Sequence, residues 1–281
     1  MPRRAGVVGS PISHSLSPAL HRAAYRALGL ADWRYDAFEL APGELAAWLA
    51  ARGPEWAGVS VTMPLKREAL ELADHVEGLA QVVGAANTIL LGPGGTVAAN
   101  TDAEGIVAAV REAAPGRVWR AATILGGGAT AATALAALAQ LGAPAPRVYA
   151  RSMARSQGLV QAAARLGAAV EFRRLRQGGQ APDWVDELVV SALPPHAADP
   201  LAAALAQADA AAPAGPGGLA AGRVLLDAAY DPWPTALAAA WQAAGGTVVA
   251  GKAMLLHQAA EQVRLMTGQA APLEAMRQAI S

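Results

Sequence analysis

The chain has 281 residues, 54% of them hydrophobic, and its 22 basic side chains balance 22 acidic ones. This length allows two modest domains or one large one, and the zero net charge gives no electrostatic footprint for nucleic acid or an anionic membrane. Because cysteine is absent, disulfides, thiolate metal sites and cysteine nucleophiles are excluded and a cytoplasmic location is favoured. The five histidines lack metal-ligand spacing, so we expect no metal.

Short apolar runs alternate with alanine-rich helical stretches, which is typical of a largely parallel sheet covered by helices. In the first hundred residues we expect strands at 5–9, 34–40, 57–61, 87–91 and 96–100, the last two forming a hairpin. Helices are expected at 18–28, 43–51, 64–72 and 103–113. In this scheme Ser17 is an N-cap before Pro18, and Pro64 is the first residue of its helix.

A second series of elements begins at residue 121. Its expected strands are 121–125, 147–150, 169–172, 188–192, 224–228 and 247–250, with a surface loop at 210–222 and two closing helices. The fold class is therefore α/β, with an open α/β domain followed by a second doubly wound domain.

The loop after strand 121–125 contains three consecutive glycines, Gly126, Gly127 and Gly128, followed by Ala129 and Thr130. A strand before and a helix after fit the G-x-G-x-x-A form of the dinucleotide fingerprint. The glycines allow a tight turn and close approach of a pyrophosphate, and the helix N-terminus supplies amide groups to its charge. We therefore expect a Rossmann-type nucleotide site.

Basic residues follow the next strand. An NAD enzyme places a carboxylate at this point to hold the ribose hydroxyls, whereas this chain has Arg151, Ser152 and Arg155. A guanidinium binds a 2′-phosphate, so NADP(H) is favoured over NAD.

Lysine and asparagine are scarce, and their positions are informative. Only Lys66 and Lys252 are lysines, the other twenty cations being arginine, and the only asparagines are Asn87 and Asn100. Lys66 lies in the first turn of an expected helix, where the helix dipole disfavours a cation. A lysine can exchange a proton whereas an arginine effectively cannot, so Lys66 is a candidate catalyst. Asp102 is either an N-cap or the acidic partner of Lys66.

A hydroxyl-rich loop follows the first strand. Ser15 and Ser17 lie between a strand and a helix, where hydroxyls and free amides can cap the helix or bind a carboxylate. Both roles remain open from the residues alone.

These segments together resemble shikimate dehydrogenase, the NADP-dependent enzyme of aromatic amino-acid biosynthesis. The matching segments cover nearly the whole chain: Ser15-Leu16-Ser17, Val61-Thr62-Met63-Pro64-Leu65-Lys66, Ala86-Asn87-Thr88, Asn100-Thr101-Asp102, the glycine loop, Tyr230-Asp231-Pro232 and Met254-Leu255-Leu256-His257-Gln258-Ala259-Ala260. The chain departs from the family pattern at Ser60, where asparagine is common, and at Ala150, where the family has another asparagine.

The resemblance implies a role for each matching residue. Ser15 and Ser17 bind the substrate carboxylate, and the ring hydroxyls are surrounded by Thr62, Lys66, Asn87, Asp102 and Gln258, with Tyr230 nearby. Lys66 is the acid–base residue and Asp102 orients it. The implied cofactor residues are Gly126, Gly127, Gly128, Ala129, Thr130, Arg151, Ser152, Arg155 and Gly251.

The implied reaction is the reversible reduction of 3-dehydroshikimate to shikimate by NADPH. The implied organisation is a substrate domain at 1–102 completed by 240–281, an NADP-binding domain at 103–239, and a cleft between them. We expect a cytoplasmic monomer or homodimer that binds a small molecule, not nucleic acid or membrane. The alternatives are a quinate or aminoshikimate dehydrogenase and a non-catalytic ligand-binding relative.

Overall fold

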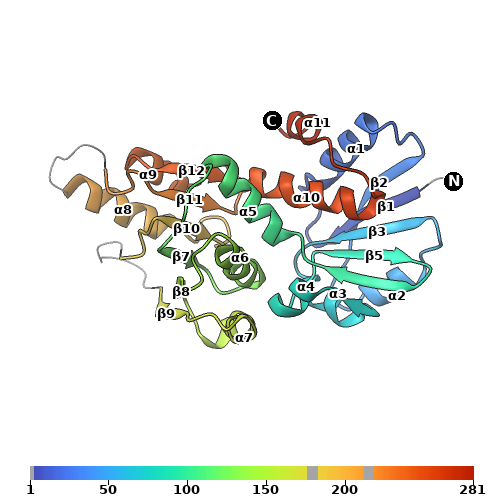
Figure 1. The fold of residues 1–281 in the computed structure, drawn as a ribbon, viewed down its shortest axis with the longest axis horizontal. Helices are drawn as coiled ribbons and strands as arrows, with labels where there is room; N and C mark the ends of the chain where they lie inside the picture. Colours follow the sequence, from blue (N-terminus) through green and yellow to red (C-terminus); the bar gives the residue numbers. More distant parts are fainter. Residues whose placement is uncertain (1–2, 176–182, 212–217) are drawn as a thin grey trace. The chain divides into compact units, whose positions relative to one another are not determined.

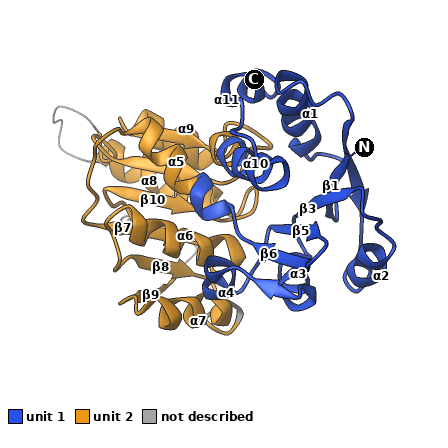
Figure 2. Cartoon of the chain, turned by 45° about the vertical axis from the view of Figure 1, so that its right-hand side comes forward, with its two compact units in different colours: residues 1–105, 255–281 blue, residues 106–254 orange. Residues whose placement is uncertain are grey.

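The computed structural model describes residues 3–175, 183–211 and 218–281, and it divides into two compact units. Unit 1 comprises residues 1–105 and 255–281, and unit 2 comprises residues 106–254 (Figure 2). The chain leaves unit 1 within helix α5 (Asp102–Ala113) and returns to it within helix α10 (Gly251–Thr267). The return comes later than the residue 240 expected from the sequence, because strand β12 (Thr247–Ala250) still pairs with the sheet of unit 2.

Unit 1 is built on a six-stranded mixed sheet with the order β2-β1-β3-β5-β6-β4. Strands β2, β1, β3 and β5 of this sheet are labelled in Figure 1. The strands are β1 (Arg3–Gly9), β2 (Trp33–Glu39), β3 (Trp56–Val61), β4 (His75–Val76), β5 (Thr88–Gly92) and β6 (Gly95–Ala99). Strands β2, β1 and β3 are parallel, whereas β5 runs antiparallel to both β3 and β6. The predicted hairpin is thus confirmed, and the short strand β4 was not predicted.

The helices of unit 1 begin at different residues from those predicted. Besides the crossing helices, they are α1 (Ser17–Ala27), α2 (Leu45–Ala50), α3 (Lys66–Leu72), α4 (Gly78–Val83) and α11 (Leu273–Gln278), of which α4 was not predicted. Ser17 is not an N-cap, because the carbonyl of Leu16 already accepts from Leu20 N. Pro64 is not helical, because Leu65 N bonds to Thr62 O in a tight turn before α3.

The sheet of unit 1 is covered on both faces, and this explains its apolar strands. Successive side chains of a strand point to opposite faces. In β1, Val7 packs in a core with Leu20 of α1 and Val263 of α10, whereas Val8 packs in a second core with Leu65 and Ala69 next to and within α3. Such two-sided burial requires nearly continuous hydrophobic runs.

Unit 2 has a parallel six-stranded sheet with the order β12-β11-β10-β7-β8-β9. Its other strands are β7 (Ala122–Leu125), β8 (Arg147–Ala150), β9 (Glu171–Arg174), β10 (Leu188–Ser191) and β11 (Val224–Asp227). The strand order reverses between β7 and β10, which is the topological switch point where doubly wound sheets bind ligands. Strand β9 lies two residues later than predicted, because Arg147 of β8 pairs with Glu171.

The helices of unit 2 are α6 (Ala129–Gln140), α7 (Gln157–Leu166), α8 (Asp199–Ala211) and α9 (Ala236–Ala243), with a short 3-10 turn, η1 (Ala154–Ser156), before α7. Of the loop predicted at 210–222, residues 212–217 lie outside the described residues, and α8 includes the first two positions. Within the described part of the chain, no helix is both long and apolar enough to cross a membrane.

Candidate active site

The sheet of unit 1 brings four polar segments to one edge. Val8 near the end of β1 pairs with Val61 at the end of β3. Because β5 is antiparallel, its first residue Thr88 lies beside Ser60, and Ala99 at the end of β6 lies opposite Thr88. The segments at this edge are those that contain Ser15 and Ser17, Thr62 and Lys66, Asn87, and Asn100-Thr101-Asp102.

At this edge Lys66 and Asp102 form an ion pair. Lys66 Nζ donates to Asp102 Oδ2, and the two side chains are 19% and 8% exposed. Each residue is the first of its helix, α3 and α5 respectively. The helix dipole favours the carboxylate at such a position and disfavours the ammonium. Asp102 therefore offsets an unfavourable position of Lys66, and the ammonium keeps a partly exposed face.

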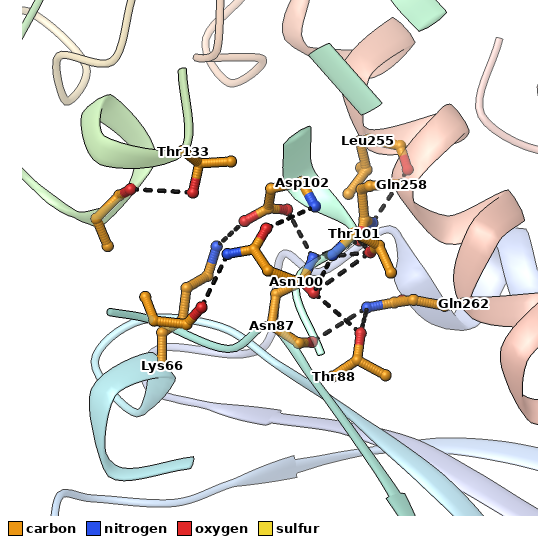
Figure 3. A network of polar contacts seen from close by, with 12 residues as sticks. Lys66, Asn87, Thr88, Asn100, Thr101, Asp102, Thr133, Leu255, Gln258 and Gln262 are labelled. Atoms are coloured by element: carbon orange, nitrogen blue, oxygen red, sulfur yellow. Dashed lines mark hydrogen bonds and ion pairs between the residues drawn. The ribbon is translucent and has the colours of Figure 1, made fainter. Parts of the chain in front are cut away.

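Asn87 is the centre of the polar network around this pair (Figure 3). Its Oδ1 accepts from Thr101 N at 2.8 Å and from Thr88 Oγ1 at 2.9 Å. Its Nδ2 lies 2.8 Å from Asp102 Oδ1 and 3.2 Å from Gln258 Oε1. Since a backbone N–H can only donate and a carboxylate can only accept, both ends of the Asn87 amide have one permitted orientation.

The other asparagine holds the first turn of α5. Asn100 Oδ1 accepts from Asp102 N at 3.1 Å, and Asn100 Nδ2 donates to Ala85 O at 2.9 Å. The capping role considered for the Asp102 side chain is thus taken by Asn100, and the Asp102 carboxylate is left to Lys66 and Asn87. Both asparagines are buried, which explains why an amide is needed at each position.

The hydroxyl-rich loop is supported by a buried histidine. Ser15 Oγ accepts from Ser17 N at 3.3 Å, and Ser17 O accepts from Nδ1 of His21 at 3.0 Å. The His21 ring stacks on Tyr35 at 3.9 Å between centroids. Burial lowers the pKa of His21 to about 4, against the weaker opposing effect of its hydrogen bond to Ser17. His21 is therefore neutral at pH 7 and supports the loop instead of exchanging protons.

The structure brings most, but not all, of the predicted substrate residues into this network. Gln258 of α10 is buried and joins Asn87 and Thr101. Thr62 is half-buried and packs on Gly9, where an added Cβ would lie 2.8 Å from Met63 O. Tyr230 belongs to unit 2, is half-buried, and has a pKa raised by burial.

In unit 2 the glycine loop leads from β7 into α6 at the switch point. Gly126 has φ of +123°, which a side chain disfavours. A Cβ on Gly127 would collide with Ser156 Oγ, whereas a Cβ on Gly128 would meet no atom within 4 Å. Gly128 precedes Ala129 and Thr130, which belong to the first turn of α6. The open side of Gly128 and the free amides of this turn fit a pyrophosphate.

The remaining cofactor candidates lie around β8 and at the start of α10. Arg151 follows β8 and is exposed, with no ion pair to any residue that the structure describes, and Ser152 is half-buried. The side chain of Arg155 lies outside the described part of the chain. Gly251 is buried, and a Cβ there would lie 2.7 Å from the carbonyl carbon of Ala228, so close backbone packing explains this glycine.

Comparison with known proteins identifies the family. A profile described as "Shikimate dehydrogenase substrate binding domain" matches residues 7–89, and one described as "Shikimate 5'-dehydrogenase C-terminal domain" matches residues 253–280. A shikimate dehydrogenase (NADP(+)) of Rubrobacter xylanophilus is 35% identical over 98% of this chain and 94% of its own length. The chain belongs to the shikimate dehydrogenase family.

Solved structures of the family agree with this assignment. The Mycobacterium tuberculosis shikimate dehydrogenase superposes with a TM-score of 0.86 at 45% identity, covering 99% of this chain and 98% of that one. A Thermus thermophilus shikimate 5-dehydrogenase in complex with NADP(H) and shikimate gives 0.78 at 29% identity, with coverages of 99% and 98%. The predicted resemblance and the predicted α/β fold class are confirmed.

A series of hydrogen-bonded polar side chains leads to Asn87, and the sequence analysis did not predict it. Tyr35 donates to Ser60, Ser60 donates to Gln262, and Gln262 reaches Asn87 and Thr88. One signal was present: Gln258 and Gln262 are four residues apart and therefore share a helix face.

Proposed function

We propose that this chain catalyses the reversible NADPH-dependent reduction of 3-dehydroshikimate to shikimate, with Lys66 as the acid–base residue. Family membership supports the reaction, and the observation that carries the catalytic assignment is the partly exposed Lys66–Asp102 pair. NADPH, when bound, supplies the hydride that reduces the ring carbonyl carbon. Negative charge then grows on the carbonyl oxygen, which requires a proton donor.

Lys66 exchanges a proton with this oxygen in both directions of the reaction. As an ammonium it donates a hydrogen bond and then a proton to the developing alkoxide; as an amine it removes the hydroxyl proton of shikimate in the oxidation. Asp102 holds the lysine side chain through Oδ2, while its Oδ1 is held by Asn87. An arginine could stabilise the charge but could not complete the proton transfer.

Substrate recognition is assigned to the rest of the sheet edge. Ser15 and Ser17 bind the carboxylate with hydroxyl and backbone amide donors. We assign the ring hydroxyls to Thr62, Asn87, Asp102 and Gln258, and the family resemblance adds Tyr230 to this set. The first four of these residues offer one carboxylate, two amides and one hydroxyl, which suit ring hydroxyls because each hydroxyl can donate to one partner and accept from another.

The residues of unit 2 fit an NADP cofactor. The turn Gly126-Gly127-Gly128 with Ala129 and Thr130 binds the pyrophosphate, and we assign Gly251 to the cofactor site on the family resemblance. Arg151, with Ser152 and Arg155, binds the 2′-phosphate, since a guanidinium without an acidic partner in the described chain is available for an anion.

The test measures cofactor reduction with shikimate or quinate, each paired with NADP⁺ or NAD⁺, for the wild type and Arg151→Ala. We expect activity with shikimate and NADP⁺, and a KM for NADP⁺ raised about tenfold or more in the variant because a charge-assisted contact is lost. Preference for quinate or NAD⁺ would replace the substrate or cofactor assignment. Folded protein that binds shikimate without turnover would indicate a ligand-binding relative.

The cellular context follows the family. Membership implies the chorismate pathway of aromatic amino-acid biosynthesis, and we propose a cytoplasmic location because the substrate and the reductant are both water-soluble. Monomer or homodimer stays a prediction that size-exclusion chromatography with light scattering tests directly.

A further inference from the structure

A continuous chain of buried side chains leads from Tyr35 to Asn87. Tyr35 OH lies 2.6 Å from Ser60 Oγ, and Ser60 Oγ lies 2.7 Å from Gln262 Oε1. Gln262 Nε2 then donates to Asn87 O at 3.1 Å and to Thr88 Oγ1 at 2.9 Å. Gln262 itself is 1% exposed, so water does not compete for these bonds.

The proton positions in this chain have one consistent direction. Ser60 has a single proton, which it gives to Gln262 Oε1 while it accepts from Tyr35. Both Nε2 protons of Gln262 are therefore directed at Asn87 O and Thr88 Oγ1. Thr88 accepts one of them and must give its own proton to Asn87 Oδ1, 2.9 Å away.

This chain of hydrogen bonds ends at the Lys66–Asp102 pair. Thr88 Oγ1 joins Thr101 N in donating to Asn87 Oδ1, and the two donors together hold the Asn87 amide with Nδ2 toward Asp102 Oδ1 (Figure 3). Asp102 Oδ2 is then the oxygen that faces Lys66. Gln262 donates to the backbone carbonyl of Asn87 and to the Thr88 hydroxyl. It therefore acts on the Lys66–Asp102 pair through Asn87, without touching Lys66 or Asp102.

We propose that Gln262 is a positioning residue for proton transfer, which it aligns by fixing Asn87 and, through Asn87, the Asp102 carboxylate. The inference rests on the proposed function of Lys66 and Asp102. Ser60 belongs to the same hydrogen-bonded chain, because its hydroxyl donates to Gln262 Oε1 while the Asn87 carbonyl holds Gln262 Nε2 on the opposite side. A purely structural role would change stability alone, whereas a positioning role changes turnover more than substrate binding.

The kinetic test uses the full chain with Gln262→Met, which keeps the length of the side chain and removes its hydrogen bonds. We expect kcat for shikimate oxidation to fall about tenfold or more while KM for shikimate changes less than about threefold. The matched control is Val263→Ala, at the next position of α10 and buried in the apolar core. It should lower the melting temperature and leave kcat within about twofold.

A double-mutant cycle distinguishes two residues that act through one series of hydrogen bonds from two that lower kcat independently. Ser60→Ala should lower kcat by itself and cause no further loss in the Gln262→Met background, because the two residues act through one chain. Three results would overturn the proposal. They are kcat losses that multiply in the double variant, a kcat for Gln262→Met within about twofold of wild type, and a fall in kcat for Val263→Ala equal to that for Gln262→Met.

A spectroscopic readout does not depend on activity. The chain contains two asparagines, so selective ¹⁵N-asparagine labelling gives two pairs of side-chain amide signals, which Asn100→Asp assigns. Gln262→Met should move the Asn87 pair, and Val263→Ala should move neither. If wild type lacks activity with shikimate but Gln262→Met moves the Asn87 signals, the proposed function fails, and with it the role in proton transfer, while the coupling of Gln262 to Asn87 stands. If wild-type turnover is normal and Gln262→Met leaves the Asn87 signals unchanged, the positioning role fails.

Discussion

Asn87 Nδ2 lies 2.8 Å from Asp102 Oδ1, and this contact divides the carboxylate between two donors, since the other oxygen pairs with Lys66. The ammonium therefore does not compete with the amide for one oxygen. The arrangement orients Asp102 and gives both of its oxygens a donor in a nearly buried position, where a charge without full hydrogen bonding would be costly.

Exchange of the Asn87 amide and the Asp102 carboxylate tests whether the contact between them is needed. Asn87→Asp places a second carboxylate beside Asp102, and we expect a loss of about 1–3 kcal/mol in the free energy of unfolding at pH 7 from the lost hydrogen bond and like-charge contact. The double variant Asn87→Asp with Asp102→Asn restores one amide and one carboxylate. It should recover part of the stability in urea titrations, while kcat stays low; no recovery would argue against the contact.

Substitution of the lysine tests the acid–base role. Lys66→Ala should lower kcat about 10²–10⁴-fold, the usual contribution of a positioned acid or base. Its Kd for shikimate, measured by calorimetry, should change far less. Lys66→Arg is the informative partner, because it keeps the charge and cannot exchange the proton. An active arginine variant, or equal losses in kcat and affinity, would reassign Lys66 to electrostatic binding.

The two neighbouring glycines of the cofactor loop should respond differently to alanine. In Gly127→Ala the new Cβ meets Ser156 Oγ, so we expect a destabilisation of about 1–3 kcal/mol. Adding Ser156→Gly should relieve it. In Gly128→Ala the Cβ enters open space, so thermal unfolding should be nearly unchanged while the KM for NADP⁺ rises. Unchanged NADP⁺ binding in Gly128→Ala would place the pyrophosphate elsewhere.

The buried histidine predicts a pH dependence of stability. Its pKa falls from the ordinary 6.5 to about 4 on folding, so the unfolded chain binds more protons between these values. Stability from this group is complete above pH 6.5 and decreases by about 3 kcal/mol as the pH falls to 4. His21→Phe keeps a ring against Tyr35 and should flatten this part of the profile. The exposed His14 provides the control, because His14→Gln should leave the slope intact.

Element boundaries show the limits of local rules. A serine before proline predicts an N-cap at Ser17, and a proline predicts the first helical position at Pro64. The structure starts α1 at Ser17 and α3 at Lys66, because Leu16 and Thr62 accept hydrogen bonds from Leu20 and Leu65. Such backbone bonds depend on how each loop leaves the sheet, which a pattern of residue types does not contain.

The sequence by itself determined the two α/β units, the glycine turn and the short set of candidate polar residues, because periodicity and rare residue types are local properties of the chain. Only the tertiary structure decided which of them meet. Lys66 and Asp102 are joined because β3 and β6 end at the same edge of one sheet. Gln262 contacts Asn87, from which it is 175 residues distant in the sequence, because α10 packs against that sheet. Contacts at such separations follow from strand order and packing.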